Sequence, residues 1–587
     1  MDKLKLFDDL DGLFEARLKD VKTVVRSTRL REGEIALSSQ LATIEVKFFY
    51  KVFDKLHSPC FIAIERETSE GLTHLIYEIV GLKAAHFQMP SIDSSVPKVI
   101  RLELLDKIRE GWEKSEEAWI DVYAVPTGYE LDTKDGELKF VRSPLTPLTG
   151  AYVHLLSDDA VKLFLCYDDG VEVGSLLGFN IGLKINMLNL VRYHMGVFGF
   201  TGVGKSNLTA FLIRKAMESI DDLKVIIFDV AGEYSIHLLD VLQNGLFYVS
   251  ERSLLNLDRL IQSQVIPETL EEKVDSRFIE IVYEKLMSED RLKLLSTSES
   301  YELTLNDVLN SLRSTFESGR SGAIAAKRAY SDLVNSLIVD KGLTEDAPLR
   351  EILANKETCE IFLNVLKELV SSLSDRAGLR SDLESMLKLT EYESGASYEK
   401  PVSTPESLAF DVWAGNTPKL TTFYVPEPIQ ARIAVSRFID KLLLLKKTSG
   451  LGTRVLIVLD EAQEYIPDRV RSEDKTENSN RAVEMLLRQG RKYRAHCWLA
   501  TQRVAHLNVN ALQQLHSYFV STLPRFYDRM VIADAFSLSY DVLEKTTTLD
   551  IGEWLFVSYK ATKRRNVPVF IKAPNNEEVL LKNFGLL

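Results

Sequence analysis

The sequence has few cysteines and no long apolar run, and both absences narrow what the protein can be. Its four cysteines, Cys60, Cys166, Cys359 and Cys497, lie far apart among 587 residues, with no C-x-x-C pair. This pattern suits a reducing compartment, so we expect neither disulfides nor a zinc site. No apolar stretch approaches the roughly 18 residues that span a bilayer. The N-terminus MDKLKLFDDLDGLF also lacks the continuous apolar stretch of a secretory signal, so we expect a cytoplasmic protein with no membrane partner.

An excess of positive charge is absent as well. The chain carries 72 Lys and Arg against 85 Asp and Glu, which gives a net charge of −13. This balance argues against a protein that coats nucleic acid with its whole surface, although it leaves room for local basic patches. The length exceeds that of one ordinary domain and predicts about two to four domains.

The stretch GFTGVGKS at 199–206 fits the phosphate-binding pattern G-x-x-x-x-G-K-[ST]. An apolar run precedes it and a helical pattern follows, so we expect the loop to join a strand to the N-terminus of a helix. Lys205 is expected to reach the β- and γ-phosphates, and Ser206 to bind Mg²⁺. A glycine-rich turn that happens to precede Lys-Ser is the alternative. The predicted nucleotide-binding residues are Gly199, Thr201, Gly202, Val203, Gly204, Lys205, Ser206 and Asn207.

A second motif follows a buried strand. The apolar run 454–459 is typical of a central parallel strand, and it ends in Asp460 and Glu461. Asp460 is predicted to hold the metal with Ser206, and Glu461 to polarise the attacking water. Taken alone, the motif also fits a buried strand that ends in two surface acids.

Further apolar runs at 224–230, 495–502, 517–521 and 553–559 alternate with helical stretches. This alternation predicts an α/β fold with a parallel sheet, helices on both faces, and ligands gathered at the carboxyl ends of the strands. Gln502 ends the strand after the Asp460–Glu461 strand. Its amide is expected to sense the γ-phosphate, with a purely structural role as the alternative.

Several blocks occur in a characteristic order. They are the P-loop entry at 192–207, FDVAGEY at 228–234, LDEAQE at 459–464, RQGRKY at 488–493 with ATQR at 500–503, and LDIGE at 549–553 followed by PVFIK at 568–572. Together they resemble the HerA/FtsK group of ring-forming DNA-pumping ATPases, and most of all the archaeal HerA family. The resemblance covers about 145–240 and 405–575. One departure is Ala231, where the family commonly has histidine.

The resemblance implies a RecA-like P-loop ATPase core that uses ATP and Mg²⁺, forms a homo-oligomeric ring of six subunits as members of the family do, and acts on double-stranded DNA. It further implies work with a NurA-type nuclease or another effector in end processing, repair or defence. Asp229 and Glu233 would be accessory acids of the site. Arg491 is the expected arginine finger, supplied in trans by a neighbouring subunit, with a solvated basic face as the alternative.

The remaining segments predict additional parts. A leading helix with Leu4, Phe7, Leu10 and Phe14 on one side is followed, from about 23 to 145, by short strand-like pieces that predict a small β-barrel, the HAS-like barrel of the family resemblance. Residues 250–405 are predicted to form an inserted helical bundle. The expected domains are therefore a barrel at 1–145, a core at 146–249 and 406–575, the insertion at 250–405, and a C-terminal tail at 576–587.

These inferences predict an ATP-driven, ring-forming double-stranded DNA translocase or helicase. Two alternatives stay open. One is a nucleotide-dependent scaffold or regulator of a nuclease or effector complex. The other is a motor of the conjugation or secretion type, although such relatives often carry membrane helices.

Overall fold

The computed structural model describes residues 5–30, 33–89, 96–113, 116–132, 138–267, 270–271, 277–297, 305–317, 322–344, 347, 349–372 and 403–586. The chain forms two compact units. The first comprises Met1–Leu295 with Pro405–Leu587, and the second comprises Ser296–Thr404. The first unit holds two sheets, and the second is helical.

Within the described residues, the N-terminal part of the first unit is a seven-stranded antiparallel sheet in the order β1-β2-β5-β4-β3-β7, with β6 paired to β5. The N–H of Leu18 donates to Ala151 O at 2.9 Å and the N–H of Gly150 donates to Leu18 O at 2.8 Å, so β1 is hydrogen-bonded to the segment before β7. The two ends of the sheet order are thus joined around one apolar core. Its elements are β1 (Ala16–Leu30), β2 (Gly33–Lys47), α1 (Tyr50–His57), β3 (Phe61–Thr68), β4 (Gly71–His86), α2 (Lys98–Gly111), β5 (Ala118–Asp132), β6 (Lys139–Arg142) and β7 (Val153–Leu155).

The predicted leading helix is wrong for the described residues from 5 onward, and Leu4 lies outside them. Leu10 and Asp11 have φ values of 50° and 64°, which a right-handed helix does not allow. The Asp8 carboxylate accepts the Leu10 N–H at 3.1 Å and favours a turn instead. The strands are also longer than predicted, since β1, β2 and β5 have 15 residues each. Because β7 belongs to this sheet, the sheet extends beyond residue 145.

The second sheet of this unit has twelve strands among the described residues, in the order β13-β12-β14-β11-β15-β16-β10-β17-β18-β19-β8-β9. Neighbours from β13 to β17 are parallel, as the sequence predicts. The prediction is wrong for 553–559, because β18 runs antiparallel to β17. The strands are β8 (Val171–Leu176), β9 (Gly182–Ile185), β10 (Met195–Phe198), β11 (Leu223–Asp229), β12 (Leu246–Val249), β13 (Leu292–Leu294), β14 (Leu420–Tyr424), β15 (Arg454–Leu459), β16 (Ala495–Thr501), β17 (Ser517–Val520), β18 (Glu553–Ser558) and β19 (Val569–Lys572).

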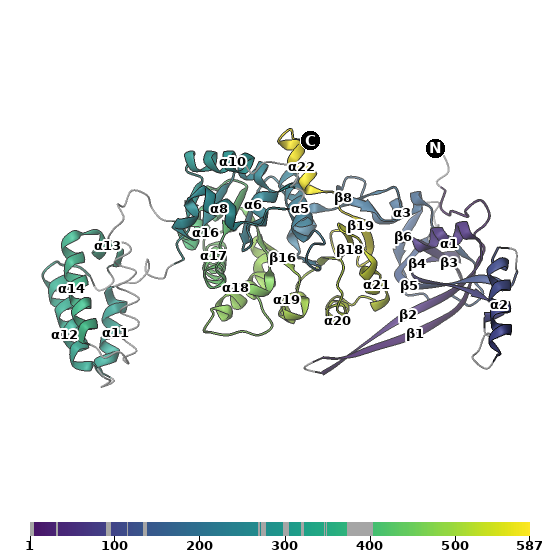
Figure 1. Ribbon diagram of the computed structural model, residues 1–587, viewed down its shortest axis with the longest axis horizontal. Coiled ribbons are helices and arrows are strands. Elements are labelled where there is room, and N and C mark those ends of the chain that lie inside the picture. Colours follow the sequence, from purple (N-terminus) through teal and green to yellow (C-terminus); the bar gives the residue numbers. More distant parts are fainter. Residues whose placement is uncertain are drawn as a thin grey trace. The chain divides into compact units, whose positions relative to one another are not determined.

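Helices cover both faces of the twelve-stranded sheet (Figure 1). Successive residues of β11 belong to different cores, because Val225 packs in one apolar cluster and Ile226 in the other. Helix α5 contributes to the first cluster and α17 to the second, so each face has its own helical layer. The helices are α3 (Asp158–Leu165), α4 (Met187–Arg192), α5 (Lys205–Ser219), α6 (Glu233–His237), α7 (Leu239–Leu242), α8 (Leu257–Ser263), α10 (Arg277–Ser288), α16 (Pro405–Ala414), α17 (Pro428–Thr448), α18 (Thr476–Gln489), α19 (Val509–Leu512), α20 (Phe526–Phe536), α21 (Tyr540–Glu544) and α22 (Asn576–Asn583).

The segment expected to be a C-terminal tail forms helix α22, which is attached to α5. Arg214 Nε donates to Asn576 Oδ1 at 2.6 Å, and the Asn576 N–H donates to Asn207 Oδ1 at 2.9 Å. Leu580 and Leu581 are buried in the core that α5 shares. These two leucines carry the packing of the segment against the first unit.

The second unit contains α11 (Leu305–Glu317), α12 (Ala323–Leu333), a π-helical turn η5 (Val334–Val339), α13 (Leu349–Ala354) and α14 (Lys356–Ser372). Leu309, Leu312 and Leu366 belong to its own apolar core. This unit begins at 296 rather than at the expected 250. The difference arises because β13 pairs with β12 and the apolar face of α10 packs in the core of the first unit. No helix in the described ranges combines the length and apolar character needed to cross a bilayer.

Candidate nucleotide-binding site

The P-loop lies where the sequence predicts it, between the end of β10 and the start of α5. Gly202 and Gly204 have φ values of 84° and 92°, a left-handed conformation that glycine adopts with little strain. Neighbouring segments hold the loop. The Phe200 N–H donates to Thr522 O at 3.0 Å, and the Gly552 N–H donates to Val203 O at 3.1 Å. The result is a fixed curl of backbone that leads into a helix N-terminus, which is a favourable environment for phosphate.

The lysine and the asparagine of this loop point to different partners. Lys205 is half-buried, and its ammonium donates to Phe200 O at 3.2 Å across the loop. The Asn207 amide instead contacts the C-terminal segment, donating to Pro574 O at 3.4 Å and accepting from the Asn576 N–H. Lys205 is therefore placed at the loop mouth, whereas the side chain of Asn207 secures the base of α5.

Strand register brings the acidic residues to the same edge of the sheet. Phe228 of β11 is opposite Leu459 of β15, so Asp229, which ends β11, and Asp460, which follows β15, lie at the carboxyl ends of adjacent parallel strands. Phe198 of β10 is opposite Thr501 of β16, which places the P-loop and Gln502 at that edge as well. The sequence-predicted groups thus converge from four strands.

Two of these carboxyl groups are deeply buried. Asp229 accepts the N–H groups of Gly232 and Tyr234 at 2.8 Å each, which fixes the turn into α6. Burial, with a contribution from Glu233, raises the pKa of Asp229 to about 7. Burial and the neighbouring carboxylates raise the pKa of Asp460 well above its ordinary value. Such a cluster of acids favours a bound cation, because a divalent ion offsets their mutual repulsion.

The oxygen donors suit Mg²⁺, which prefers hydroxyl and carboxylate oxygens together with water. The Ser206 hydroxyl is hydrogen-bonded to the carboxylate of Glu233, and Asp460 interacts electrostatically with Glu233. Ser206 and Asp460 are the groups that would hold the ion, and Glu233 stands beside them. When bound, Mg²⁺ would supply neutralising charge to the phosphates.

Glu461 lies at the centre of a polar network. It has a left-handed backbone conformation with φ 46° and accepts hydrogen bonds at both carboxylate oxygens. Gln502 Nε2 donates to one oxygen at 3.0 Å, and Gln463 Nε2 donates to the other at 2.7 Å. The Thr201 hydroxyl of the P-loop donates to the carbonyl oxygen of Gln502. The carboxylate is therefore oriented by two amides, one of which also contacts the phosphate-binding loop.

Sequence reasoning missed the roles of Thr201 and Gln463 in this network. Thr501 Oγ1 donates to Gln463 Oε1 at 2.6 Å, so Gln463 bridges β16 and Glu461. The only signal in the sequence was the position of Gln463 inside the LDEAQE block. The contact between Gln463 and Thr501 can be recognised only from the structure, in which β15 and β16 are neighbours.

Arg491 does not join this group. It lies in the turn before β16, whereas Gln502 follows β16. Arg491 is therefore at the edge formed by the amino ends of the parallel strands, and Gln502 is at the opposite edge, formed by their carboxyl ends. Its exposed guanidinium lies 5.3 Å from the ring centroid of Tyr193, which precedes β10. Within one chain, Arg491 therefore does not reach the P-loop site.

Comparison with known proteins shows what this chain is similar to. A family model described as "Helicase HerA, central domain" matches residues 171–400. The DNA double-strand break repair helicase HerA of Sulfolobus acidocaldarius is 23% identical over 421 residues, which cover 71% of this chain and 72% of that protein. The same-named protein of Sulfurisphaera tokodaii is 23% identical over 474 residues, covering 80% of each. A solved structure of VirB4 of Thermoanaerobacter pseudethanolicus aligns with a TM-score of 0.36 and 14% identity, over 70% of this chain and 99% of that one.

Proposed function

We propose that this chain, a member of the HerA-like superfamily, is an ATP-hydrolysing motor that forms a ring and translocates double-stranded DNA. The observation that carries the proposal is the convergence of the P-loop, Asp460, Glu461 and Gln502 at the carboxyl edge of one parallel sheet. The relatives named DNA double-strand break repair helicase support the choice of DNA as substrate.

Each site residue has a distinct role in this proposal. The loop residues 199–207 bind the nucleotide, and Lys205 neutralises the β- and γ-phosphates. Ser206 and Asp460 hold Mg²⁺, with Asp229 shaping the neighbouring turn and Glu233 orienting Ser206. Glu461 positions and polarises the attacking water. Gln502 links that carboxylate to the phosphate-binding loop.

Arg491 acts in trans in the same proposal. Its position at the edge opposite the P-loop leaves it exposed and away from the site of its own chain. An arginine at one edge of a subunit can contact the nucleotide bound at the opposite edge of the next subunit only if the subunits associate head to tail. Such association gives a closed ring or an open stack. A hexameric ring, as the family resemblance implies, is the arrangement we propose.

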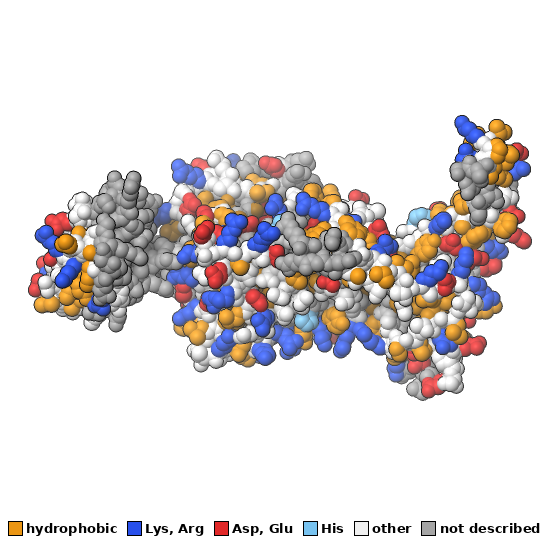
Figure 2. Space-filling model, turned by 90° about the horizontal axis from the view of Figure 1, so that it is seen from below, with side chains coloured by type: hydrophobic (Ala, Val, Ile, Leu, Met, Phe, Trp, Pro, Cys, Tyr) orange, Lys and Arg blue, Asp and Glu red, His pale blue; other side chains and the backbone are white. Residues whose placement is uncertain are grey.

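The surface charge is compatible with DNA binding despite the net charge of −13. Figure 2 shows Lys and Arg side chains over one face of the molecule, interspersed with Asp and Glu. Four exposed arginines lie in the segments that follow β15, β16 and β17, at the catalytic edge: Arg469, Arg471, Arg503 and Arg525. Arginines so placed can contact phosphates of a duplex and change that contact with the state of the nucleotide.

Hydrolysis measurements with the full chain test this function. ATP turnover is expected to rise on addition of duplex DNA, and the chain is expected to displace a triplex-forming strand only when ATP is hydrolysed. Glu461→Gln should bind duplex and fail in both assays. A wild-type chain that hydrolyses ATP without any response to duplex, yet activates a nuclease, would favour the scaffold alternative. Native mass measurement gives the size of the ring.

A NurA-type nuclease is the partner we propose, in DNA end processing within the cytoplasm. The N-terminal sheet is the proposed docking region, and its helix α2 supports this choice because it exposes four apolar residues, Val99, Ile100, Leu102 and Leu105. Such a patch is typical of a protein interface. The double variant Val99→Asp and Leu102→Asp should keep ATP turnover and lose capture of the purified nuclease. Lys107→Ala, on the same helix, is the control, and undiminished capture by the aspartate variant would count against this docking site.

A further inference from the structure

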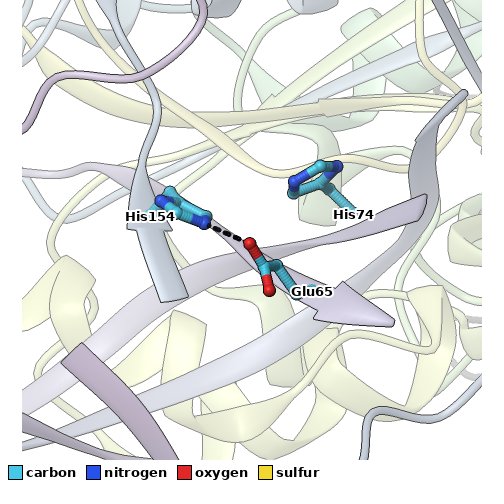
Figure 3. A group of neighbouring side chains, drawn as sticks. All are labelled: Glu65, His74 and His154. Carbon is cyan, nitrogen blue, oxygen red and sulfur yellow. Dashed lines mark hydrogen bonds and ion pairs between the residues drawn. The ribbon is translucent and has the colours of Figure 1, made fainter. Parts of the chain in front are cut away.

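Three side chains with metal-binding chemistry meet in the N-terminal sheet, outside the nucleotide site. They are Glu65 of β3, His74 of β4 and His154 of β7 (Figure 3). One ligand atom from each lies within 4.8 Å of the others. Within the described part of the chain, no other group of three or more His, Cys, Asp and Glu residues meets this criterion.

The register of the strands explains why these residues share one face. Glu65 is directly opposite His74, and His154 is opposite Ala63, two residues before Glu65. Side chains alternate along a strand, so Ala63, Glu65 and their partners point the same way. The intervening residues Ile62 and Ile64 point into the apolar core of the sheet. The three polar groups therefore lie across three neighbouring strands, on the face opposite that core.

The geometry leaves ring nitrogens available to a ligand. His154 Nε2 lies 2.9 Å from Glu65 Oε1, while His74 Nδ1 is buried and has no hydrogen-bond partner among the described residues. Figure 3 shows the two imidazoles on either side of the Glu65 carboxylate. The Phe7 ring packs against both imidazoles, at centroid distances of 5.1 Å to His74 and 4.6 Å to His154. Its contact with His154 is stacked, and stacking covers ring faces but not the in-plane lone pairs that bind a metal.

We propose that Glu65, His74 and His154 bind one Zn²⁺ ion or a similar late first-row dication. Two imidazole nitrogens and one carboxylate oxygen are a common ligand set for zinc, and they leave a fourth position for water or for a partner's side chain. Small movements would bring the donors to zinc-ligand distances of about 2.0–2.2 Å. The ion would join β7 to the β3–β4 hairpin. This inference does not depend on the proposed motor function.

The competing explanation is a structural one, in which Glu65 and His154 form a hydrogen-bonded pair under the Phe7 ring and His74 fills the remaining space. The half-buried position of all three residues is compatible with both explanations. The two explanations make different demands on residue 65. A structural pair needs a hydrogen-bond acceptor there but no negative charge. A metal site needs the carboxylate of Glu65 and both histidines. Spacing along the sequence gave no sign of such a site, because the residues come from three separate strands.

Co²⁺ and Zn²⁺ titrations of the metal-free full chain test the proposal. The chain would carry Asp460→Asn, so that a metal held by the nucleotide site does not contribute. We expect one Co²⁺ per chain with the visible absorption bands of tetrahedral coordination, displacement of Co²⁺ by Zn²⁺, and a rise in the thermal midpoint with added Zn²⁺. Absence of saturable Co²⁺ binding would overturn the proposal.

Ligand variants separate the two explanations. His74→Ala and His154→Ala should lose the tetrahedral spectrum. Glu65→Gln keeps a hydrogen-bond acceptor for His154, so its metal-free thermal midpoint should stay near that of the parent, while its Zn²⁺ affinity falls about tenfold or more. The exposed His506→Ala is the matched control and should bind as the parent does. Unchanged Co²⁺ spectra in both histidine variants, with intact thermal transitions, would show that the ion binds elsewhere.

Discussion

The Gln502 side chain joins Glu461 to Thr201, because its amide nitrogen donates to the Glu461 carboxylate at 3.0 Å and its carbonyl oxygen accepts from the Thr201 hydroxyl. One amide thus contacts both the proposed water-activating carboxylate and the loop that binds phosphate. A change in the position of the loop would be transmitted directly to the carboxylate. From this arrangement we propose that Gln502 acts in turnover rather than in nucleotide affinity.

Gln502→Ala should therefore lower kcat for ATP on the order of 10²-fold, the usual effect of removing one positioned hydrogen-bonding group. The Kd for ATP should change little, because the phosphate contacts of residues 199–206 remain. Steady-state turnover and equilibrium binding of a fluorescent ATP analogue measure the two effects. The exposed Gln513→Ala is the control. Equal losses in kcat and in affinity would contradict the positioning role.

Lys205→Ala and Glu461→Gln should separate nucleotide binding from hydrolysis. Removal of the lysine takes a positive charge from the bound phosphates, so ATP affinity should collapse. The glutamine variant keeps the size of Glu461 but cannot polarise water, so it should bind ATP and hydrolyse it at least about 10²-fold more slowly. Calorimetric binding and phosphate release provide the measurements. Lys215→Ala, on the exposed part of α5, should behave as the wild type, and matching affinity losses in the first two variants would argue against the assigned roles.

The sequence predicted the central sheet well because buried parallel strands are nearly continuous apolar runs. The stretches around Asp229, Asp460 and Gln502 were each recognised as strand ends, and all three reach the same edge. Strand order could not be predicted in this way. The position of β10 between β16 and β17, and the antiparallel addition of β18, depend on crossovers whose packing involves residues far apart in sequence.

The errors have a common physical cause. The apolar spacing of Phe7, Leu10 and Phe14 fits a helix, but the turn-forming aspartates between them and the strand partner of Phe7 at Leu156 override it. Residues 277–288 were correctly expected to be helical, yet they belong to the first unit because their apolar face packs there. The local apolar pattern thus identified this segment as a helix, whereas its tertiary packing determines the unit to which the helix belongs.

The attachment of α22 to α5 should be important for stability. The Arg214 guanidinium is buried, forms two hydrogen bonds with Asp240, and also donates to Asn576. Asn576→Ala leaves one donor of this charged group without its partner, at a cost of about 1–3 kcal/mol. The thermal midpoint should fall, and limited proteolysis should remove α22 faster. Glu578→Ala, exposed on the same helix, is the control. An unchanged rate of cleavage would show that the leucines alone hold the helix.

Glu78 should make the stability of the first unit depend on pH. This residue of β4 is 2% exposed, and burial raises its pKa from 4.5 to about 7, partly offset by Lys545. The folded state therefore binds the proton more tightly than the unfolded state, so stability is highest below about pH 4.5 as far as this group is concerned and falls as the pH rises to about 7. The total change is about 3 kcal/mol.

Glu78→Gln removes the charge and should raise the thermal midpoint at pH 8, with little effect at pH 4.5. Differential scanning calorimetry at the two pH values measures the difference. The exposed Glu67→Gln on β3 should show no such pH dependence. If Glu78→Gln lowers the midpoint at pH 8, the carboxylate is charged and stabilised in the folded chain, contrary to this prediction.

Arg491 should contribute to ATP hydrolysis only between subunits, because it lies at the sheet edge opposite Gln502 in its own chain. Arg491→Ala should lower turnover about 10³-fold or more, since arginine fingers stabilise charge in the transition state. A mixture of Arg491→Ala and Glu461→Gln chains should regain part of the activity, because some interfaces then combine an intact Glu461 with an intact Arg491 from the neighbour. Arg488→Ala, in the preceding turn of α18, is the control. No recovery in particles that native mass measurement shows to contain both chains would rule against a role in trans, and normal turnover by Arg491→Ala alone would leave the residue as part of a solvated basic surface.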